Sequence, residues 1–370
     1  MSIKTYFPAV KAPTIPGEQV KAFRAKFNSN FDFPEWQLVD ESYIGIEIEV
    51  ENVRHEIENS FLWHYKEDGS LRNHGLEFIS IPLKGKLVGI ALNAAEYLIP
   101  KEAQFSQRTS IHIHLNVQDW EPQILYKYFI VYLTLEPLLY QWVGKDREDN
   151  IFCRPWYQTD TVDGLITSLK NFDATIRTVG YIQHNHKRYS GLNFESLHKF
   201  GTIEFRHLGG TRNVETIINW INLLLSIKKY VLHMGEKDLI ARIVNLNTRS
   251  DYFLFISNVL GVYSNLVVCP TMSSLLEFGS KVVKKSAIAN TFLEELQLSP
   301  NSRFSKCFDA LNLRAKMKKI NVDIVDPPGA FLMDDIMPEI QPRFGFARPD
   351  HFGVAADIER RMAELNEGPE

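Results

Sequence analysis

The sequence predicts an α+β fold in which helices pack on one face of an antiparallel sheet. Three short segments, 43–51, 110–116 and 202–206, alternate apolar and polar residues with the period of two that is typical of strands. Two longer segments, 119–143 and 213–234, have the length and apolar content of buried helices. One sheet register then places the apolar side of every strand in the core and leaves a polar trough on the opposite face.

The composition is that of a globular chain. Its 370 residues are 45% hydrophobic, which is enough to bury at least one large core. The formal net charge of -4 provides no global basic field for nucleic acid or for an anionic membrane. The start has no continuous apolar stretch like that of a secretory signal, and three scattered cysteines form no disulfide framework. We therefore expect a cytoplasmic protein with no nucleic-acid or membrane partner.

Proline and charge divide the chain into four parts. Residues 1–38 read as an extended N-terminal arm, and 39–235 hold the strands and the two long helices. A helical accessory region at 236–325 is expected to pack on this main domain, with helices at 251–260 and 273–285. A Pro-rich, charged tail follows at 326–370 and ends in a short helix at 355–365.

The two long helices have recognisable ends. Asp119 is the expected N-cap of the first, and Pro137 is expected to kink it. Asn213 is the expected N-cap of the second, which we expect to stop at Gly235.

The first strand has a face of glutamates. Ile44, Ile46, Ile48 and Val50 share one side of segment 43–51, whereas Glu47, Glu49 and Glu51 share the other. Neighbours on one side of a strand are about 6.6 Å apart, so these carboxylates repel one another unless a cation lies between them. A solvent-facing strand surface explains the alternation equally well.

Two further strands repeat the pattern with other polar groups. His112, His114 and Asn116 alternate with apolar residues in 110–116, and Glu204 and Arg206 do so in 202–206. A single histidine is more often a structural hydrogen-bonding residue. For a pair on one face, contact with a metal or a phosphate explains the pattern about as well as this structural role does. The glutamate and the arginine could equally form a simple ion pair across the sheet.

A fourth acidic position follows a turn. The segment Asp68-Gly69-Ser70 predicts a turn, which favours Asp68 as a turn former over a metal ligand, and Glu77 lies in the mostly apolar strand after it. A buried carboxylate needs a neutralising cation, so Glu77 lies at an exposed strand end or near a positive charge. Together these segments supply an oxygen-rich set suited to Mg²⁺ or Mn²⁺, with an arginine as anion clamp. The set comprises Glu47, Glu49, Glu77, His112, Glu204 and Arg206.

The order of these motifs resembles that of the amidoligase family, which is similar to the glutamine synthetase and glutamate–cysteine ligase superfamily of carboxylate–amine ligases. The resemblance spans 43 to about 211, and the following helix extends it to about 235. The matching segments are Gly45-Ile46-Glu47-Ile48-Glu49, Asp68-Gly69-Ser70-Leu71, the Gly75–Ser80 segment, Ser110-Ile111-His112-Ile113-His114-Leu115-Asn116, Arg188–Asn193, Thr202-Ile203-Glu204-Phe205-Arg206 and Gly209-Gly210-Thr211.

This resemblance implies a glutamine-synthetase-like curved sheet and makes 39–235 a ligase-like catalytic domain. It also implies an ATP-dependent reaction through an acyl phosphate, with two Mg²⁺ ions, or Mn²⁺, bridging the ATP phosphates. Glu49 and Glu77 would hold one ion, and Glu47, His112 and Glu204 the other. Arg206 would stabilise the transferring phosphoryl group, and Arg188 would contact phosphate or the acyl phosphate. The resemblance makes His114 and Asn193 candidates for contact with nucleotide or substrate.

Two other functions remain open from the sequence. A metal-dependent phosphoesterase or nuclease would use the same residue types around two ions. A non-catalytic relative would keep the sheet and bind a nucleotide or a peptide without turnover. The sequence has no GxxxxGK[ST] segment, which disfavours a P-loop enzyme. Substrates resembling amino acids or peptides are expected, as a small-molecule, peptide or protein carboxylate and amine, whereas the sequence predicts no oligomeric state.

Overall fold

A computed structural model describes residues 2–6, 36–54, 57, 60–159, 161–170 and 189–291. These residues belong to one unit, Met1–Thr291. Most of the predicted N-terminal arm lies outside the described residues, as do Arg188, the end of the accessory region and the whole predicted tail with its final helix.

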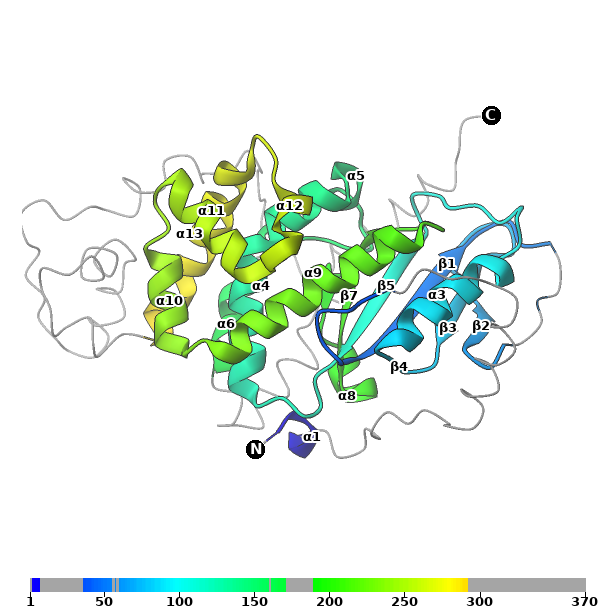
Figure 1. The fold of residues 1–370 in the computed structure, drawn as a ribbon, viewed down its shortest axis with the longest axis horizontal. Coiled ribbons are helices and arrows are strands. Elements are labelled where there is room, and N and C mark those ends of the chain that lie inside the picture. The colour runs from blue at the N-terminus through cyan, green and yellow to red at the C-terminus, as the bar shows by residue number, and fades with distance from the viewer. Residues whose placement is uncertain are drawn as a thin grey trace, which may run out of the picture. The chain divides into compact units, whose positions relative to one another are not determined.

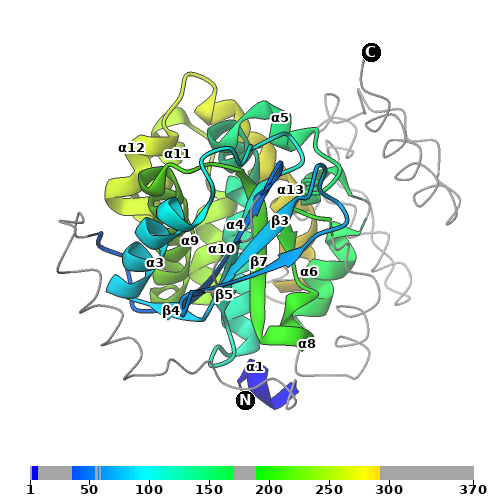
Figure 2. The same cartoon turned by 90° about the vertical axis from the view of Figure 1, so that its right-hand side faces the viewer.

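The alternating segments form one antiparallel sheet, as the sequence predicts. Its path follows the order β2-β3-β1-β5-β7-β6, and β4 also pairs with β1 (Figures 1 and 2). The sheet is not strongly curled, so the curvature that the family resemblance implies stays an expectation (Figure 2). Within the described part of the chain, its seven strands are β1 (Tyr43–Val50), β2 (Trp63–Glu67), β3 (Leu76–Ser80), β4 (Leu83–Lys84), β5 (Ser110–Asn116), β6 (Leu192–Asn193) and β7 (Thr202–Gly209).

Helices cover the apolar face of this sheet and pack on one another beyond it (Figure 1). None of the described helices is both long and apolar enough to cross a membrane. The α-helices are α1 (Ile3–Tyr6), α3 (Lys86–Leu98), α4 (Pro122–Val143), α5 (Lys145–Glu148), α6 (Val162–Lys170), α8 (Ser196–Phe200), α9 (Val214–His233), α10 (Glu236–Val244), α11 (Arg249–Leu260), α12 (Ser264–Val267) and α13 (Met272–Thr291).

The apolar side of the strands faces the core, which confirms the predicted register. Phe205 of β7 lies between Tyr128 and Tyr132 of α4, with ring centroids 6.0 and 6.1 Å away. Trp220 of α9 lies 5.3 Å from the ring of His207 on β7. The alternating apolar residues are at most 2% exposed: Ile46, Ile48, Ile111, Ile113, Ile203 and Phe205. Because a strand has a period of two, their burial directs the charged residues between them to the opposite face.

The start of α4 corrects one prediction. Asp119 does not cap the helix, because its carboxylate pairs with Lys4 Nζ at 2.8 Å and the helix begins at Pro122. Proline is favoured in the first helical turn because its φ is preset and its missing N–H would have no partner there. The helix continues through Pro137 to Val143.

The second long helix begins as predicted. The side chain of Asn213 accepts a hydrogen bond from the Thr216 N–H at 2.9 Å and so caps α9. The helix ends at His233, two residues before the predicted stop, and Gly235 is instead the residue that precedes α10. Farther along, α11 ends at Leu260 immediately before Gly261, as predicted.

Helix α13 packs closely against α4. A Cβ added at Gly279 would lie 2.3 Å from the carbonyl oxygen of Thr134, so only glycine allows this approach. The described part of the predicted accessory region therefore contacts the helix that supports the sheet.

A buried glutamate lies in the middle of α4. Glu136 Oε1 accepts hydrogen bonds from Tyr132 Oη at 2.6 Å and from the Trp156 N–H at 2.9 Å, and Oε2 accepts from the Tyr157 N–H at 3.2 Å. Burial raises the pKa of Glu136 to about 7 although these hydrogen bonds oppose the shift. The same Tyr132 hydroxyl lies 2.9 Å from His207 Nε2. Burial also lowers the pKa of His207 to about 3, so the ring is neutral and can donate to this hydroxyl.

Glu136→Gln is expected to weaken the pH dependence of stability. Folded Glu136 holds its proton up to a pH of about 7, whereas the unfolded chain releases it near 4.5, so the free energy of unfolding falls as pH rises through this window. Glutamine has no proton to lose. Urea unfolding at pH 5 and pH 8 should therefore show a smaller loss of stability in the variant than in the wild type. Equal losses in both proteins would show that Glu136 does not titrate in this range.

Candidate active site

The polar face of the sheet forms the predicted trough. It is a cavity of about 240 Å³ between the two edges of the sheet, with walls from the loops around Ser70 and Phe152 and from α8. Its floor consists of six acidic and histidine side chains from β1, β3, β5 and β7, namely Glu47, Glu49, Glu77, His112, His114 and Glu204.

Strand register brings these side chains together. Glu47 lies opposite His112, Glu49 opposite Glu77, and His114 opposite Glu204. Segments that are far apart in the sequence therefore meet on one face. Gly45 lies opposite His114, where a Cβ would be only 3.1 Å from the histidine Cβ, so glycine leaves room for the imidazole ring.

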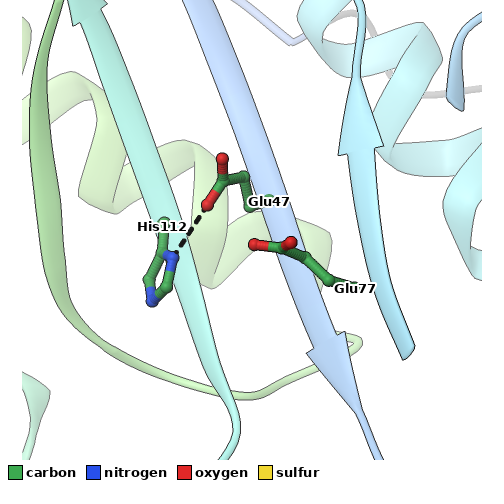
Figure 3. Close-up of side chains that lie close together, drawn as sticks. All are labelled: Glu47, Glu77 and His112. Carbon is green, nitrogen blue, oxygen red and sulfur yellow. Dashed lines mark hydrogen bonds and ion pairs between the residues drawn. The ribbon is translucent and has the colours of Figure 1, made fainter. Parts of the chain in front are cut away.

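Glu47 is at the centre of the first group. Its Oε2 lies 2.9 Å from His112 Nδ1, and its Oε1 lies 3.1 Å from His114 Nε2. Figure 3 shows Glu47 directed toward His112, with the Glu77 carboxylate beside it. His112 Nδ1 is also 3.5 Å from Glu204 Oε1. Two histidines and two carboxylates are therefore packed within direct ion-pair distance.

The charges of this group shift one another. Burial alone would raise the pKa of Glu47, but the charge of His114 and hydrogen bonds from both histidines hold it well below its usual value. Burial likewise opposes ionisation of Glu204, whereas Arg206 and His114 lower its pKa. The pKa of His114 is raised despite burial because Glu47 and Glu204 face it. The cluster is therefore arranged to hold ionised carboxylates next to cations.

Glu49 and Glu77 form the second group. Glu49 Oε2 accepts hydrogen bonds from the Ser110 N–H at 2.8 Å and from Ser110 Oγ at 2.6 Å. Glu77 Oε2 pairs with Lys66 Nζ at 2.6 Å. Burial and the charge of nearby Glu47 raise the pKa of Glu77 to about 7. A divalent cation beside Glu77 would reverse this shift, because it would favour the ionised carboxylate.

Among the residues that the structure describes, three overlapping sets of side chains could hold a metal ion. Within each set the ligand atoms lie no more than 4.8 Å from one another, and the sets are Glu47, Glu77 and His112; Glu47, His114 and Glu204; and Glu49, Asp68 and Glu77. Carboxylate oxygens with few nitrogens suit Mg²⁺ or Mn²⁺. Glu47 and Glu77 each belong to two of these sets.

Asp68, which the sequence favours as a turn former over a ligand, lies where it could serve as both. Its Oδ1 accepts a hydrogen bond from the Ser70 N–H at 2.7 Å, which fits the predicted turn. The same side chain also lies with Glu49 and Glu77 as a possible third ligand. Its distance of nine positions from Glu77 in the sequence gives no sign of this, because the connection depends on the pairing of β2 with β3.

Arg206 lies against the same cluster. One terminal nitrogen pairs with Glu204, and Nε donates to the carbonyl of Phe152 at 3.0 Å. The arginine side chain is only 12% exposed and that of Glu204 8%, so this is a buried pair rather than one on a solvated sheet surface. Asn193 Nδ2 donates to the other oxygen of Glu204 at 2.8 Å.

A β-bulge in β7 lies at the position of Arg206. Pairing between β5 and β7 shifts register between Ile111 and Ile113, which gives β7 one extra residue there. Arg147 holds the bulge, because its Nε donates to the carbonyl of His207 at 2.8 Å and its Nη2 to that of Arg206 at 2.9 Å. Its Nη1 lies 3.3 Å from the carbonyl of Gln107. No sequence pattern pointed to Arg147.

The structure brings nearly all of the predicted site residues into one trough. Glu47, Glu49, Glu77, His112, His114, Asn193, Glu204 and Arg206 all line it. Glu51, the third glutamate of the alternating face, instead accepts a hydrogen bond from the Arg72 N–H at 2.8 Å. Arg188 lies outside the described residues.

Comparison with known proteins gives one finding. A family model described as "Putative amidoligase enzyme" matches residues 24–228, more than half of the 370 residues, and this span includes every strand of the trough. No curated protein matches the chain.

Proposed function

The chain belongs to this amidoligase family, and from this premise we propose that it is an ATP- and Mg²⁺-dependent ligase that joins a carboxylate to an amine through an acyl phosphate. Membership makes it an amide-bond-forming enzyme. The family description names neither a phosphate donor nor a metal. The carboxylates and the arginine of the trough support ATP as the donor and Mg²⁺ as the metal, with Mn²⁺ as a substitute.

The observation that supports this best is the position of Arg206 beside the carboxylate cluster. Three metal-ligand sets overlap in one trough, and a buried guanidinium lies against one of their members, Glu204. Phosphoryl transfer needs such an arrangement, because charge is spread over phosphate oxygens and must be neutralised at fixed positions. Divalent ions would supply part of that neutralisation.

The proposed roles follow the positions of the side chains. Glu49 and Glu77, with Asp68, would hold one ion, and Glu47, His112 and Glu204 the other. His114 Nε2 lies 3.1 Å from Glu47 Oε1, and His114 belongs to one of the metal-ligand sets. It is therefore either an alternative metal ligand to His112 or a contact for nucleotide or substrate. Asn193 orients Glu204 and can also contact a ligand. Arg188 is proposed to contact phosphate on the strength of the family motif.

The reaction has two steps. A carboxylate oxygen of the acid attacks the γ-phosphorus of ATP and ADP leaves, which gives an acyl phosphate. The amine nitrogen then attacks the acyl carbon, phosphate leaves, and the amine proton passes to solvent or to the departing phosphate. Activation is needed because a carboxylate is a poor electrophile and hydroxide a poor leaving group. Arg206 would neutralise the phosphoryl oxygens during the first step.

Oxygen labelling tests this function directly. Full-length protein is incubated with ATP, Mg²⁺ and a panel of ¹⁸O-labelled amino-acid and peptide carboxylates with amines, and products are measured by mass spectrometry. We expect an amide, ADP, and phosphate that contains one ¹⁸O from the acid. Cleavage of phosphoesters without ATP would support the phosphoesterase or nuclease instead. Binding of ATP without turnover over the panel would support the non-catalytic relative.

Arg147→Lys is expected to reduce turnover about tenfold, with a smaller change in KM. Lysine lacks the planar fork that fixes the directions in which Arg147 donates to the Arg206 and His207 carbonyls, so the bulge should relax and the Arg206 guanidinium should lose its fixed direction. Steady-state kinetics of the variant measure this split between kcat and KM.

Arg212→Lys is the matched control. Arg212 also donates to main-chain carbonyls, those of Ile99, Pro100 and Ala103, at a position that does not line the trough. Both variants should lower the melting temperature to a similar extent, but only Arg147→Lys should slow turnover. Equal turnover in the two variants would reduce Arg147 to a structural role.

A further inference from the structure

Lys66 places an ammonium group directly on one of the proposed metal ligands. It lies opposite Glu77 in the pairing of β2 with β3, and its Nζ is 2.6 Å from Glu77 Oε2. The two side chains differ in exposure, 59% for the lysine and 6% for the glutamate. The lysine therefore reaches from the solvent at the sheet edge onto a buried carboxylate.

The acids around this contact need a cation. Glu77 lies opposite Glu49, and the charge of Glu47 acts on it as well. Glu77 also belongs to two of the three metal-ligand sets. An ion bound at Glu77 would approach the same carboxylate that Lys66 now contacts, and like charges at such a distance repel.

We propose that the Lys66 ammonium serves as the cation beside Glu77 when no metal ion is bound, a role called here the resident cation. A divalent ion would displace Lys66 from Glu77. The Lys66 ammonium would then pair with the phosphate groups that the ion holds. The inference rests on the proposed function and adds to it a residue and an order of events. A long, flexible and mostly exposed side chain suits this exchange, because the lysine ammonium stays accessible to solvent and can turn away from Glu77 without disturbing the strand.

Lys199 provides a matched comparison in the same trough. Its side chain is 52% exposed, and it pairs with Glu195 at 3.7 Å, outside the three metal-ligand sets. Removal of its charge changes the charge of the trough as much as removal of Lys66 does. Any difference between the two variants then reports the contact with Glu77.

The test measures Mn²⁺ binding to full-length wild type, Lys66→Gln and Lys199→Gln without nucleotide, by calorimetry. Lys66→Gln is expected to bind Mn²⁺ about three- to tenfold more tightly than wild type, whereas Lys199→Gln binds it nearly unchanged. A non-hydrolysable ATP analogue is then added at saturating Mn²⁺. Lys66→Gln should bind this analogue about three- to tenfold more weakly, so the two ligands shift in opposite directions.

Other results would overturn the proposal in distinguishable ways. If Lys66→Gln binds Mn²⁺ no more tightly than wild type does, Lys66 is not the resident cation. If Lys66→Gln binds the ATP analogue as tightly as wild type does, Lys66 does not contact the phosphate groups. Absence of Mn²⁺ binding in the wild type would end the metal assignment together with this inference. Opposite shifts in a protein that turns over no ATP would support Lys66 and reject the ligase. Melting temperatures measured in EDTA confirm that each variant is folded.

Discussion

Replacement of Arg206 with lysine is expected to lower ligase turnover by on the order of 10² or more. Lysine keeps the charge next to Glu204 but loses the planar fork that can bridge phosphate oxygens, and it loses the hydrogen bond to the Phe152 carbonyl. Nucleotide affinity should fall less than turnover, because the charge that Arg206 meets is greatest in the transition state. Steady-state kinetics and equilibrium binding of an ATP analogue measure the two effects separately.

Melting temperature distinguishes this role from a structural one. The buried ion pair with Glu204 can survive as a lysine–glutamate pair, so the melting temperature should change little. Arg212→Lys again serves as the control for an arginine-to-lysine exchange at a distance from the trough. Normal ATP-dependent condensation by Arg206→Lys would remove Arg206 from the catalytic residues and leave it as the partner of Glu204.

Glu77→Ala is expected to abolish metal-dependent ATP binding. The variant removes a carboxylate from two of the three metal-ligand sets. It also removes a buried acid that faces Glu49 and lies near Glu47, so the melting temperature should stay equal or rise slightly. Calorimetry with ATP and Mg²⁺ measures the binding, and the same titration in EDTA shows how much of it depends on the metal.

Glu49→Ala should also abolish metal-dependent ATP binding, but it should lower the free energy of unfolding more than Glu77→Ala does. It leaves the buried Ser110 N–H without its acceptor, which destabilises by about 1–3 kcal/mol. Glu51→Ala is the control within the same alternating face, because Glu51 binds the Arg72 N–H instead of facing the trough. Metal-dependent binding that persists in both Glu49→Ala and Glu77→Ala would show the metal assignment to be wrong.

The sequence predicted the sheet because alternation is a local signal. In β1, β5 and the 202–206 part of β7 every second residue is apolar, and burial of that side fixed which face the charged residues occupy. The gathering of Glu47, His112 and Glu204 in one place followed from that register together with the order of motifs. Their predicted roles are tested by the metal-binding and turnover measurements.

Features that depend on tertiary contacts could not be predicted in this way. Alternation continues through Glu204-Phe205-Arg206 with no sign of the bulge that follows, because a bulge depends on pairing with β5 and on the clamp from Arg147. Lys66 was missed because β2 is a short edge strand of five residues, too brief for its pattern to stand out. The helix cap at Asp119 was misjudged because Lys4, more than a hundred positions away, pairs with it.

The order of strands in the sheet has a consequence for how the protein folds. β1 pairs with β3 on one side and with β5 on the other, while β7 joins beyond β5 after a long intervening chain that includes α4. Glu47 and Glu204 meet only when this last central strand has docked. Contacts between residues so distant along the chain are slow to form, because the loop between them must close first. During synthesis the carboxylates of β1 and β3 emerge long before Glu204 and Arg206, so a nascent or truncated chain that ends before β7 would lack the residues that complete the trough, and metal affinity would report completed folding.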